Sequence, residues 1–264
     1  MPASGIVGPR AQAMDITTQV SSMPSTEDYR LSHLERGGSY DTLLAETPFD
    51  AYMAAWEQRH LADILGRLYP TGIARYLDFA CGTGRITTTV GPLCRQSVAV
   101  DISPSMIEVA RQKLPATTFH LCDLTQDELD LGSFDLITSF RFFGNAQDDL
   151  RENALRAIVK RLAPGGNLVI NSHRNPRALY ALFDRLSGGS AGSMDLHLSK
   201  LRALLRRHGL QIRLLQPIGA WMYRSRLLGS SRADAPAAVA NERRFAHPAL
   251  AAIAPDVIVV AQRA

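Results

Sequence analysis

Residues 76–86, Tyr-Leu-Asp-Phe-Ala-Cys-Gly-Thr-Gly-Arg-Ile, constrain the fold of this chain more than any other stretch. An apolar strand leads there into a turn of small residues, and we expect a helix to follow. Small residues let backbone N–H groups approach a ligand, and the N-terminus of a helix adds a favourable dipole. The segment therefore predicts a nucleotide-binding turn at the end of a buried strand.

Two acids distinguish this turn from a dinucleotide site. Asp78 lies in the strand before the turn, and Asp101 follows the next apolar strand, Ser97–Val100. A Rossmann dinucleotide site needs a third glycine three residues after the second, so that a pyrophosphate can sit on the helix N-terminus. The chain has Thr87 at that position, and a site for an anion has no use for Asp78. The pattern argues against a dinucleotide ligand.

The sequence Asp-Phe-Ala-Cys-Gly-Thr-Gly, followed by Val-Ala-Val-Asp-Ile-Ser, resembles the class I S-adenosylmethionine-dependent methyltransferases. Their ligand carries a sulfonium, an ammonium and a ribose diol but no phosphate, and the resemblance extends over residues 60–264. It implies an α/β fold, the Rossmann-like methyltransferase fold, with a seven-stranded, mostly parallel, doubly wound sheet that contains one antiparallel strand. The implied cofactor is S-adenosyl-L-methionine.

The resemblance also implies roles for individual residues. Asp78 is expected near the methionine amino group, Asp101 at both ribose hydroxyls and Asp123 at the adenine amino group. Ala80 stands where the family usually has glycine. The complete set expected to bind the cofactor is Tyr40, Asp78, Ala80, Gly82, Gly84, Asp101, Ile102, Met106, Asp123, Leu124 and Phe140.

Further strands are expected at residues 118–124, 134–139, 167–171, 209–215 and 255–260. Between the strands at 134–139 and 167–171, apolar residues recur at helical spacing, which predicts the crossover helix that a parallel sheet requires. We expect three parts in the chain: a flexible N-terminal tail over 1–27, a helical N-terminal cover over 28–70 and the methyltransferase domain over 71–264.

Two segments follow the fourth and fifth strands, where open α/β sheets bind their ligands. The first contains Arg141, which is expected to meet an anion, either an internal acid such as Asp148 or a carboxylate or phosphate of the substrate. The second contains His173, the best-placed group to take a proton near neutral pH. The alternative for His173 is a structural role in the loop. We therefore name His173 and Arg141 as the candidate catalytic residues, and no histidine or cysteine spacing indicates a metal site.

The net charge of +4 raises the question of nucleic acid. The densest basic cluster, residues 200–213, lies on a helix whose other face is leucine-rich, so we interpret it as a solvated helix face. The Asn/Asp-Pro-Pro-aromatic motif of amino-group DNA methyltransferases is absent. A nucleic-acid partner is therefore not expected.

Three cysteines argue against a disulfide framework, and no apolar run approaches the ~20 residues that span a bilayer. We expect a cytoplasmic protein without membrane contact, and a homodimer is a possible oligomeric state. The sequence favours O-methylation of a small organic acceptor such as a sugar, lipid or secondary metabolite. The alternatives are an N-methyltransferase of a small amine, a methyltransferase of RNA or protein, and a non-catalytic subunit that binds S-adenosylmethionine.

Overall fold

A computed structural model describes residues 29, 37–186, 196–222 and 233–263, so the expected tail over 1–27 lies outside the described residues. Its helices are α1 (Gly37–Glu46), α2 (Pro48–Leu68), α3 (Thr87–Val90), α4 (Pro104–Lys113), α5 (Asp148–Arg161), α6 (Leu179–Leu186), α7 (Leu198–Arg207) and α8 (Pro236–Arg244). Two 3₁₀ turns, η3 (Gly91–Leu93) and η5 (Pro248–Ala252), complete the helical elements. The strands are β1 (Ile73–Phe79), β2 (Cys94–Asp101), β3 (Thr118–Leu121), β4 (Phe134–Ser139), β5 (Leu162–Ser172), β6 (Leu210–Ile218) and β7 (Asp256–Arg263).

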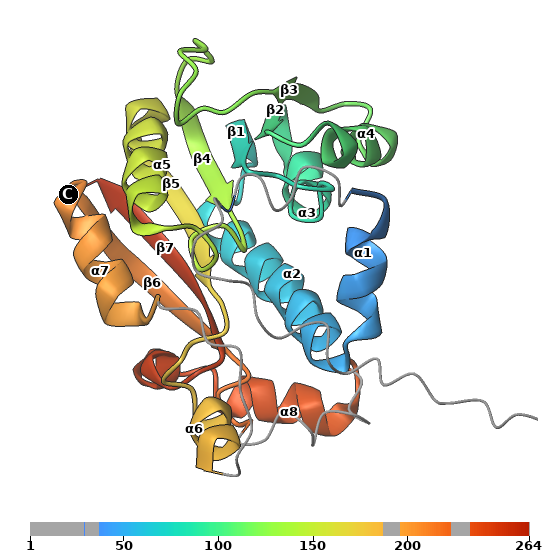
Figure 1. Ribbon diagram of the computed structural model, residues 1–264, viewed down its shortest axis with the longest axis vertical. Helices are drawn as coiled ribbons and strands as arrows, with labels where there is room; N and C mark the ends of the chain where they lie inside the picture. Colours follow the sequence, from blue (N-terminus) through green and yellow to red (C-terminus); the bar gives the residue numbers. More distant parts are fainter. Residues whose placement is uncertain (1–28, 30–36, 187–195, 223–232, 264) are drawn as a thin grey trace, which may run out of the picture.

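The strands form one sheet in the order β3-β2-β1-β4-β5-β7-β6, with helices on both sides (Figure 1). Neighbouring strands are parallel from β3 through β5, whereas β7 runs antiparallel to both β5 and β6. The expected seven-stranded sheet with one antiparallel strand is thus confirmed. The strand order reverses direction between β1 and β4, and such a switch point is where open α/β sheets bind ligands.

Each face of the sheet packs against its own set of helices. On β7, Val257 and Val259 join the core with α5 and α7, while Ile258 and Val260 join the core with α2. This alternation is the two-residue period of a strand that is buried on both sides. Helix α2 therefore covers one face of the sheet, and it comes directly before β1 in the chain.

Two elements next to the site differ from the sequence prediction. The helix after the glycine turn, α3, has only four residues and continues as the 3₁₀ turn η3, so it contributes little dipole. The strand expected at 118–124 ends at Leu121, because Asp123 accepts hydrogen bonds from the backbone and hydroxyl of Thr125 in a local turn. Asp123 consequently lies in the loop beyond the strand end.

Candidate cofactor and acceptor site

One open pocket lies beyond the carboxyl ends of β1, β2, β3 and β4, and its empty volume is about 990 Å³. Its walls include ten of the eleven residues expected to bind the cofactor, together with Arg141. Those ten residues are Tyr40, Asp78, Ala80, Gly82, Asp101, Ile102, Met106, Asp123, Leu124 and Phe140. Five separate segments of the chain therefore meet at the switch point of the sheet.

The turn after β1 presents its backbone to this pocket. Ala80, Gly82 and Gly84 have φ angles of 58°, 55° and 78°, in the left-handed region that favours glycine. A Cβ on Gly82 would meet no atom within 4 Å, so the space above that residue is open. A Cβ on Gly84 would lie 3.2 Å from Cβ of Ala110 in α4. Gly84 therefore lets the turn pack closely on α4, and it is the one expected cofactor residue outside the pocket wall.

Asp101 ends β2 with its carboxylate fixed by the backbone. Oδ2 accepts a hydrogen bond from the N–H of Gly82 at 2.8 Å, and Oδ1 accepts one from the N–H of Ser103 at 2.9 Å. Burial raises the pKa of Asp101, and these backbone bonds oppose that shift. Each carboxylate oxygen keeps further acceptor capacity, and Asp101 has no cationic partner within the described part of the chain. Such a carboxylate fits a pair of neutral hydroxyl donors.

Asp78 lies deeper, with its side chain 1% exposed. It accepts hydrogen bonds from Thr87 Oγ1 at 2.5 Å and from Thr138 Oγ1 at 2.8 Å, and Thr138 is also bonded to the hydroxyl of Tyr76. Burial raises the pKa of Asp78 to about 6, against the lowering effect of these hydroxyl donors. A cation brought into the pocket would favour the ionised form of this group.

Helix α1 closes one side of the pocket and carries Tyr40 into the wall. Asp41 accepts a hydrogen bond from Thr83 Oγ1 at 2.6 Å and pairs with Lys113 of α4, whose ammonium also donates to the carbonyl of Thr83. The N–H of Gly37 donates to Ser105 Oγ at 3.1 Å. The start of α1 is thus attached both to the glycine turn and to α4.

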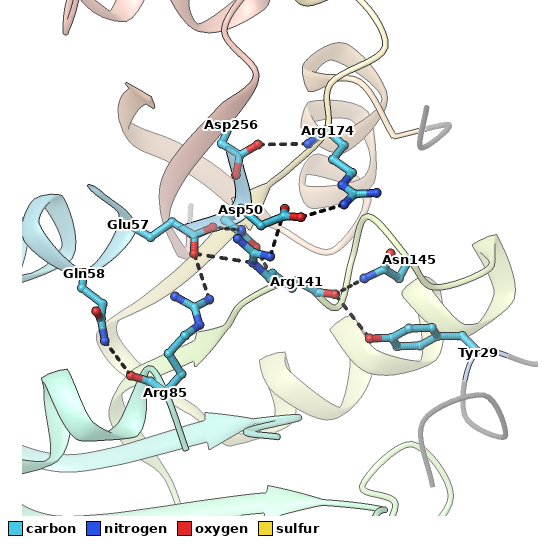
Figure 2. A network of polar contacts seen from close by, with 10 residues as sticks. Tyr29, Asp50, Glu57, Gln58, Arg85, Arg141, Asn145, Arg174 and Asp256 are labelled. Carbon is cyan, nitrogen blue, oxygen red and sulfur yellow. Dashed lines mark hydrogen bonds and ion pairs between the residues drawn. The ribbon is translucent and has the colours of Figure 1, made fainter. Parts of the chain in front are cut away.

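A buried group of charges borders the pocket on the side of β4 and β5 (Figure 2). Glu57 of α2 is 0% exposed and pairs with Arg85 at 2.8 Å and with Arg141 at 3.6 Å. Asp50 lies 3.6 Å from Arg141 and 3.1 Å from Arg174. The two surrounding arginines hold the pKa of Glu57 below its usual value despite burial.

Arg141 lies beside internal acids, which is one of the two alternatives expected from the sequence, but Asp148, the acid named as an example, is not among them. Asp148 pairs with Arg151 of its own helix and with Lys200 of α7. The acids near Arg141 are Asp50 and Glu57 of α2 instead (Figure 2), and Glu57 also accepts a hydrogen bond from Asn171 of β5. Asp148 was named because it is only seven residues from Arg141 in the chain. Its position on α5 instead directs its side chain toward Lys200 of α7.

His173 lies next to this charged group and outside the pocket wall. Its side chain is 5% exposed, and its Nδ1 atom is buried with no hydrogen-bond partner in the described part of the chain. The ring packs so closely on Gly144 that a Cβ there would lie 2.6 Å from Cε1. Burial and then the charges of Arg141 and Arg174 lower the pKa of His173 well below its usual value. The imidazole is therefore neutral at physiological pH.

Sequence reasoning did not single out Glu57, although the helical pattern contains a signal for it. Met53, Glu57 and Leu61 are spaced at i, i+4 and i+8, so a glutamate occupies the buried stripe of α2. Buried acids are rare unless they are paired. The position of Glu57 on the apolar stripe of α2 could thus have predicted a buried cationic partner for its carboxylate.

The residues of the glycine turn and the adjacent acids fit S-adenosylmethionine. Asp101 offers oxygens to hydroxyl groups and the wall around Ile102 and Met106 is apolar, as an adenosine group requires. Asp78 offers a buried carboxyl to a cation. By contrast, the four-residue helix α3 provides a poor binding site for a pyrophosphate.

Comparisons with known proteins agree with this assignment. A family model described as a methyltransferase domain matches residues 77–166. A ubiquinone biosynthesis O-methyltransferase of Xanthomonas axonopodis pv. citri (strain 306) is 30% identical over 190 residues, which cover 65% of this chain and 76% of that protein. The chain belongs to the S-adenosylmethionine-dependent methyltransferases. Its cofactor is S-adenosylmethionine, and it is an enzyme.

Solved structures place this methyltransferase in the same fold. Magnesium protoporphyrin IX methyltransferase of Synechocystis PCC 6803, with bound S-adenosyl-L-homocysteine (SAH), aligns with a TM-score of 0.61 at 14% identity. The alignment covers 90% of this chain and 100% of that one. The N-methyltransferase NodS of Bradyrhizobium japonicum WM9, also with SAH, gives a TM-score of 0.57 at 20% identity, over 90% and 99% of the two chains. Other Xanthomonas relatives named ubiquinone biosynthesis O-methyltransferase align over a shorter stretch. In the relative from Xanthomonas campestris pv. campestris (strain B100), the match covers 47% of that protein.

Proposed function

We propose that this methyltransferase transfers the methyl group of S-adenosylmethionine to an oxygen atom of a small organic acceptor. The observation that carries the proposal is the division of one pocket into two kinds of wall. Acids from the ends of β1 and β2 line one part, and Phe140, Arg141 and Phe142 from the end of β4 line another. The name of the Xanthomonas relative, a ubiquinone biosynthesis O-methyltransferase, supports oxygen as the methylated atom.

When bound, S-adenosylmethionine supplies an electrophilic methyl group on a sulfonium. The chain must then hold a nucleophilic oxygen in line with that methyl group, and such positioning alone removes a large part of the barrier. Phe140 and Phe142 are both buried beside the glycine turn. In our proposal, they form an apolar wall that excludes water, with Phe140 against the cofactor, as expected from the sequence, and Phe142 against the acceptor.

We propose His173 as the group that accepts the acceptor's proton. Its neutral imidazole carries a buried Nδ1 without a partner in the described part of the chain, and it adjoins the loop that carries Arg141. Since the pKa of His173 is lowered well below its usual value, the imidazole stays unprotonated as the pH falls toward 6. A decline of activity in that range would then have to come from another group, such as the acceptor hydroxyl.

We propose a small molecule, in preference to RNA, as the acceptor because two of the four basic residues of α7, Lys200 and Arg207, are paired with acids of α5. Lys200 lies 3.0 Å from Asp148, and both Arg207 and His208 contact Glu152 of α5. No described helix is long and apolar enough to cross a membrane. The homodimer and the cytoplasmic location expected from the sequence stay predictions.

Transfer of a ¹³C-labelled methyl group tests this proposal. The protein is incubated with methyl-labelled S-adenosylmethionine and a panel of catechols, hydroxybenzoates, sugars and small amines, and the products are identified by NMR. We expect signals in the methoxy region, and we expect His173→Ala to slow their appearance by at least about tenfold while the affinity for SAH is unchanged. N-methyl products from the amines, or no transfer to any member of the panel, would contradict O-methylation. Equal losses of turnover and SAH affinity in His173→Ala would show a structural role.

A further inference from the structure

The guanidinium of Arg141 is buried beside the pocket with its donors poorly used. Its side chain is 12% exposed, and its ion pairs to Asp50 and Glu57 are both 3.6 Å long. Its Nε atom is buried and makes no hydrogen bond to any described residue. Arg151 provides a comparison, because that buried guanidinium donates to two carbonyl oxygens and to Asp148. A guanidinium has five N–H donors, so Arg141 has unused donors at the edge of a ligand pocket.

The surrounding structure holds Arg141 in an unfavourable backbone conformation. Its φ angle is 58°, which is uncommon for a residue other than glycine because Cβ crowds the following carbonyl oxygen. The side chain of Asn171 fixes this backbone conformation. Its Oδ1 accepts a hydrogen bond from the N–H of Arg141 at 2.6 Å, and its Nδ2 donates one to Glu57 at 2.6 Å. The carbonyl of Arg141 accepts from Tyr29 and Asn145. Contacts on both sides of the residue therefore determine where the guanidinium lies (Figure 2).

The position of Arg141 separates it from the residues expected at the adenosine. Asp101 and Asp123 follow β2 and β3, on one side of β1 in the sheet. Arg141 follows β4, on the other side of β1, and its charged neighbours include Asp50 of α2. The guanidinium thus borders the part of the pocket left for the acceptor, next to the walls formed by Phe140 and Phe142.

The charge of the buried group favours an anion there. Three guanidiniums, those of Arg85, Arg141 and Arg174, lie among the carboxylates of Asp50 and Glu57. A third carboxyl group, that of Asp256, has its pKa raised to about 7 by burial and by Glu57, so it is partly protonated at neutral pH. Asp256 accepts from the backbone N–H of Arg174, so three guanidiniums share two carboxylates as ion-pair partners, and a bound carboxylate would supply a third.

We propose that Arg141 binds a carboxylate group of the acceptor, so that the acceptor is a small organic acid with a separate hydroxyl turned toward the methyl donor. The planar guanidinium matches a carboxylate through two parallel hydrogen bonds, which fixes orientation as well as charge. The aromatic residues beside it suit a flat ring between the two ends of the acceptor. This inference rests on the proposed function, because it names the class of acceptor for the same pocket.

A matched pair of probes tests the carboxylate site without knowledge of the natural acceptor. Benzoate and benzamide have similar shapes, and only benzoate is charged. Their binding to the SAH-loaded protein is measured by calorimetry for the wild type, Arg141→Met, Arg141→Lys and the exposed control Arg206→Met. We expect benzoate to bind the wild type and Arg206→Met at least about tenfold more tightly than benzamide. Arg141→Met should lose this preference, and Arg141→Lys should keep part of it.

Several outcomes would overturn the inference. A carboxylate site at Arg141 would be excluded by any of three results. In these results, benzoate fails to bind the wild type, binds it no better than benzamide does, or binds Arg141→Met as well as the wild type. A second arm compares SAH with 5′-methylthioadenosine, which lacks the amino-acid group. If Arg141→Met weakened SAH about tenfold or more and left 5′-methylthioadenosine unchanged, the guanidinium would bind the cofactor's own carboxylate. Failure of SAH to bind the wild type would instead count against the proposed function.

Discussion

The carboxyl group of Asp78 accepts hydrogen bonds only from hydroxyl groups among the described residues, those of Thr87 and Thr138. Hydroxyl donors stabilise a buried carboxylate less than a cation would, and the pKa of Asp78 is consequently raised from 3.8 to about 6. The ionised form is therefore costly in the cofactor-free protein. A methionine ammonium group near Asp78 would offset that cost, so the same residue links stability to cofactor binding.

We predict that Asp78→Asn stabilises the cofactor-free protein at pH 8 but weakens S-adenosylmethionine binding. The folded pKa of Asp78 is raised, so its stabilising contribution is full below about pH 4 and is lost as the pH rises through about 6. The free energy of unfolding of Asp78→Asn should thus equal that of the wild type near pH 4 and exceed it by about 1–3 kcal/mol above pH 7. Urea unfolding of both proteins at pH 4 and pH 8 measures this difference. Equal free energies of unfolding at pH 8 would contradict the prediction.

At the residue scale, local motifs were predictable from the sequence and long-range charge partners were not. Asp78 and Asp101 stand at fixed offsets from a glycine turn, and the structure places both in the pocket wall. Arg141 could be placed at the end of β4, but its neighbours Asp50 and Glu57 are more than eighty positions away in the chain. Only the packing of α2 against the strand ends brings these charges together.

Helix α1 is attached to the pocket by contacts at its first turn. Gly37 begins the helix so close to α4 that an added Cβ would lie 2.3 Å from the carbonyl oxygen of Ser105. Asp41, one turn later, contacts Thr83 and Lys113. The position of Tyr40 in the pocket wall therefore depends on this close approach of α1 to α4.

We predict that Gly37→Ala weakens SAH binding about threefold to tenfold, because α1 must move away from α4. Gly66→Ala is the matched control, since an added Cβ in α2 meets nothing within 4 Å and the helix gains about 0.5–1 kcal/mol. Calorimetric titration with SAH and a thermal melt of each variant check both expectations. Unchanged SAH affinity in Gly37→Ala would show that α1 does not contribute to the cofactor site.

At the element scale, prediction succeeded where a strand is buried on both sides. The expected bounds of β4, residues 134–139, agree with the structure. The strand expected at 167–171 is longer in the structure, because β5 begins at Leu162 and includes a shift in register, with a φ of 76° at Gly165. The helix expected after the glycine turn is present as α3, and it is short because the threonines after Ile86 have no strong preference for extending a helix.

The whole molecule is a sheet with a helical layer on each face and one pocket at the point where the strand order reverses. The alternation of strand and helix patterns in the sequence was sufficient to predict this arrangement. It could not predict the charged group of Figure 2, which forms only where α2 crosses the ends of β4 and β5. The family resemblance thus predicted which residues would line the pocket, and the proposal for the acceptor side depends on the three-dimensional packing.

Asp101, the acid at the end of β2, is expected to hold the cofactor in this pocket. We would titrate three proteins with SAH: the wild type, Asp101→Ala and the exposed control Asp149→Ala. We predict micromolar affinity for the wild type and Asp149→Ala, and no binding of NADH. Asp101→Ala should lose about 1.5–3 kcal/mol, or roughly tenfold to a hundredfold in affinity, because two charge-assisted hydrogen bonds to the ribose disappear. Equal affinities of Asp101→Ala and the wild type would contradict the assignment of this pocket to S-adenosylmethionine.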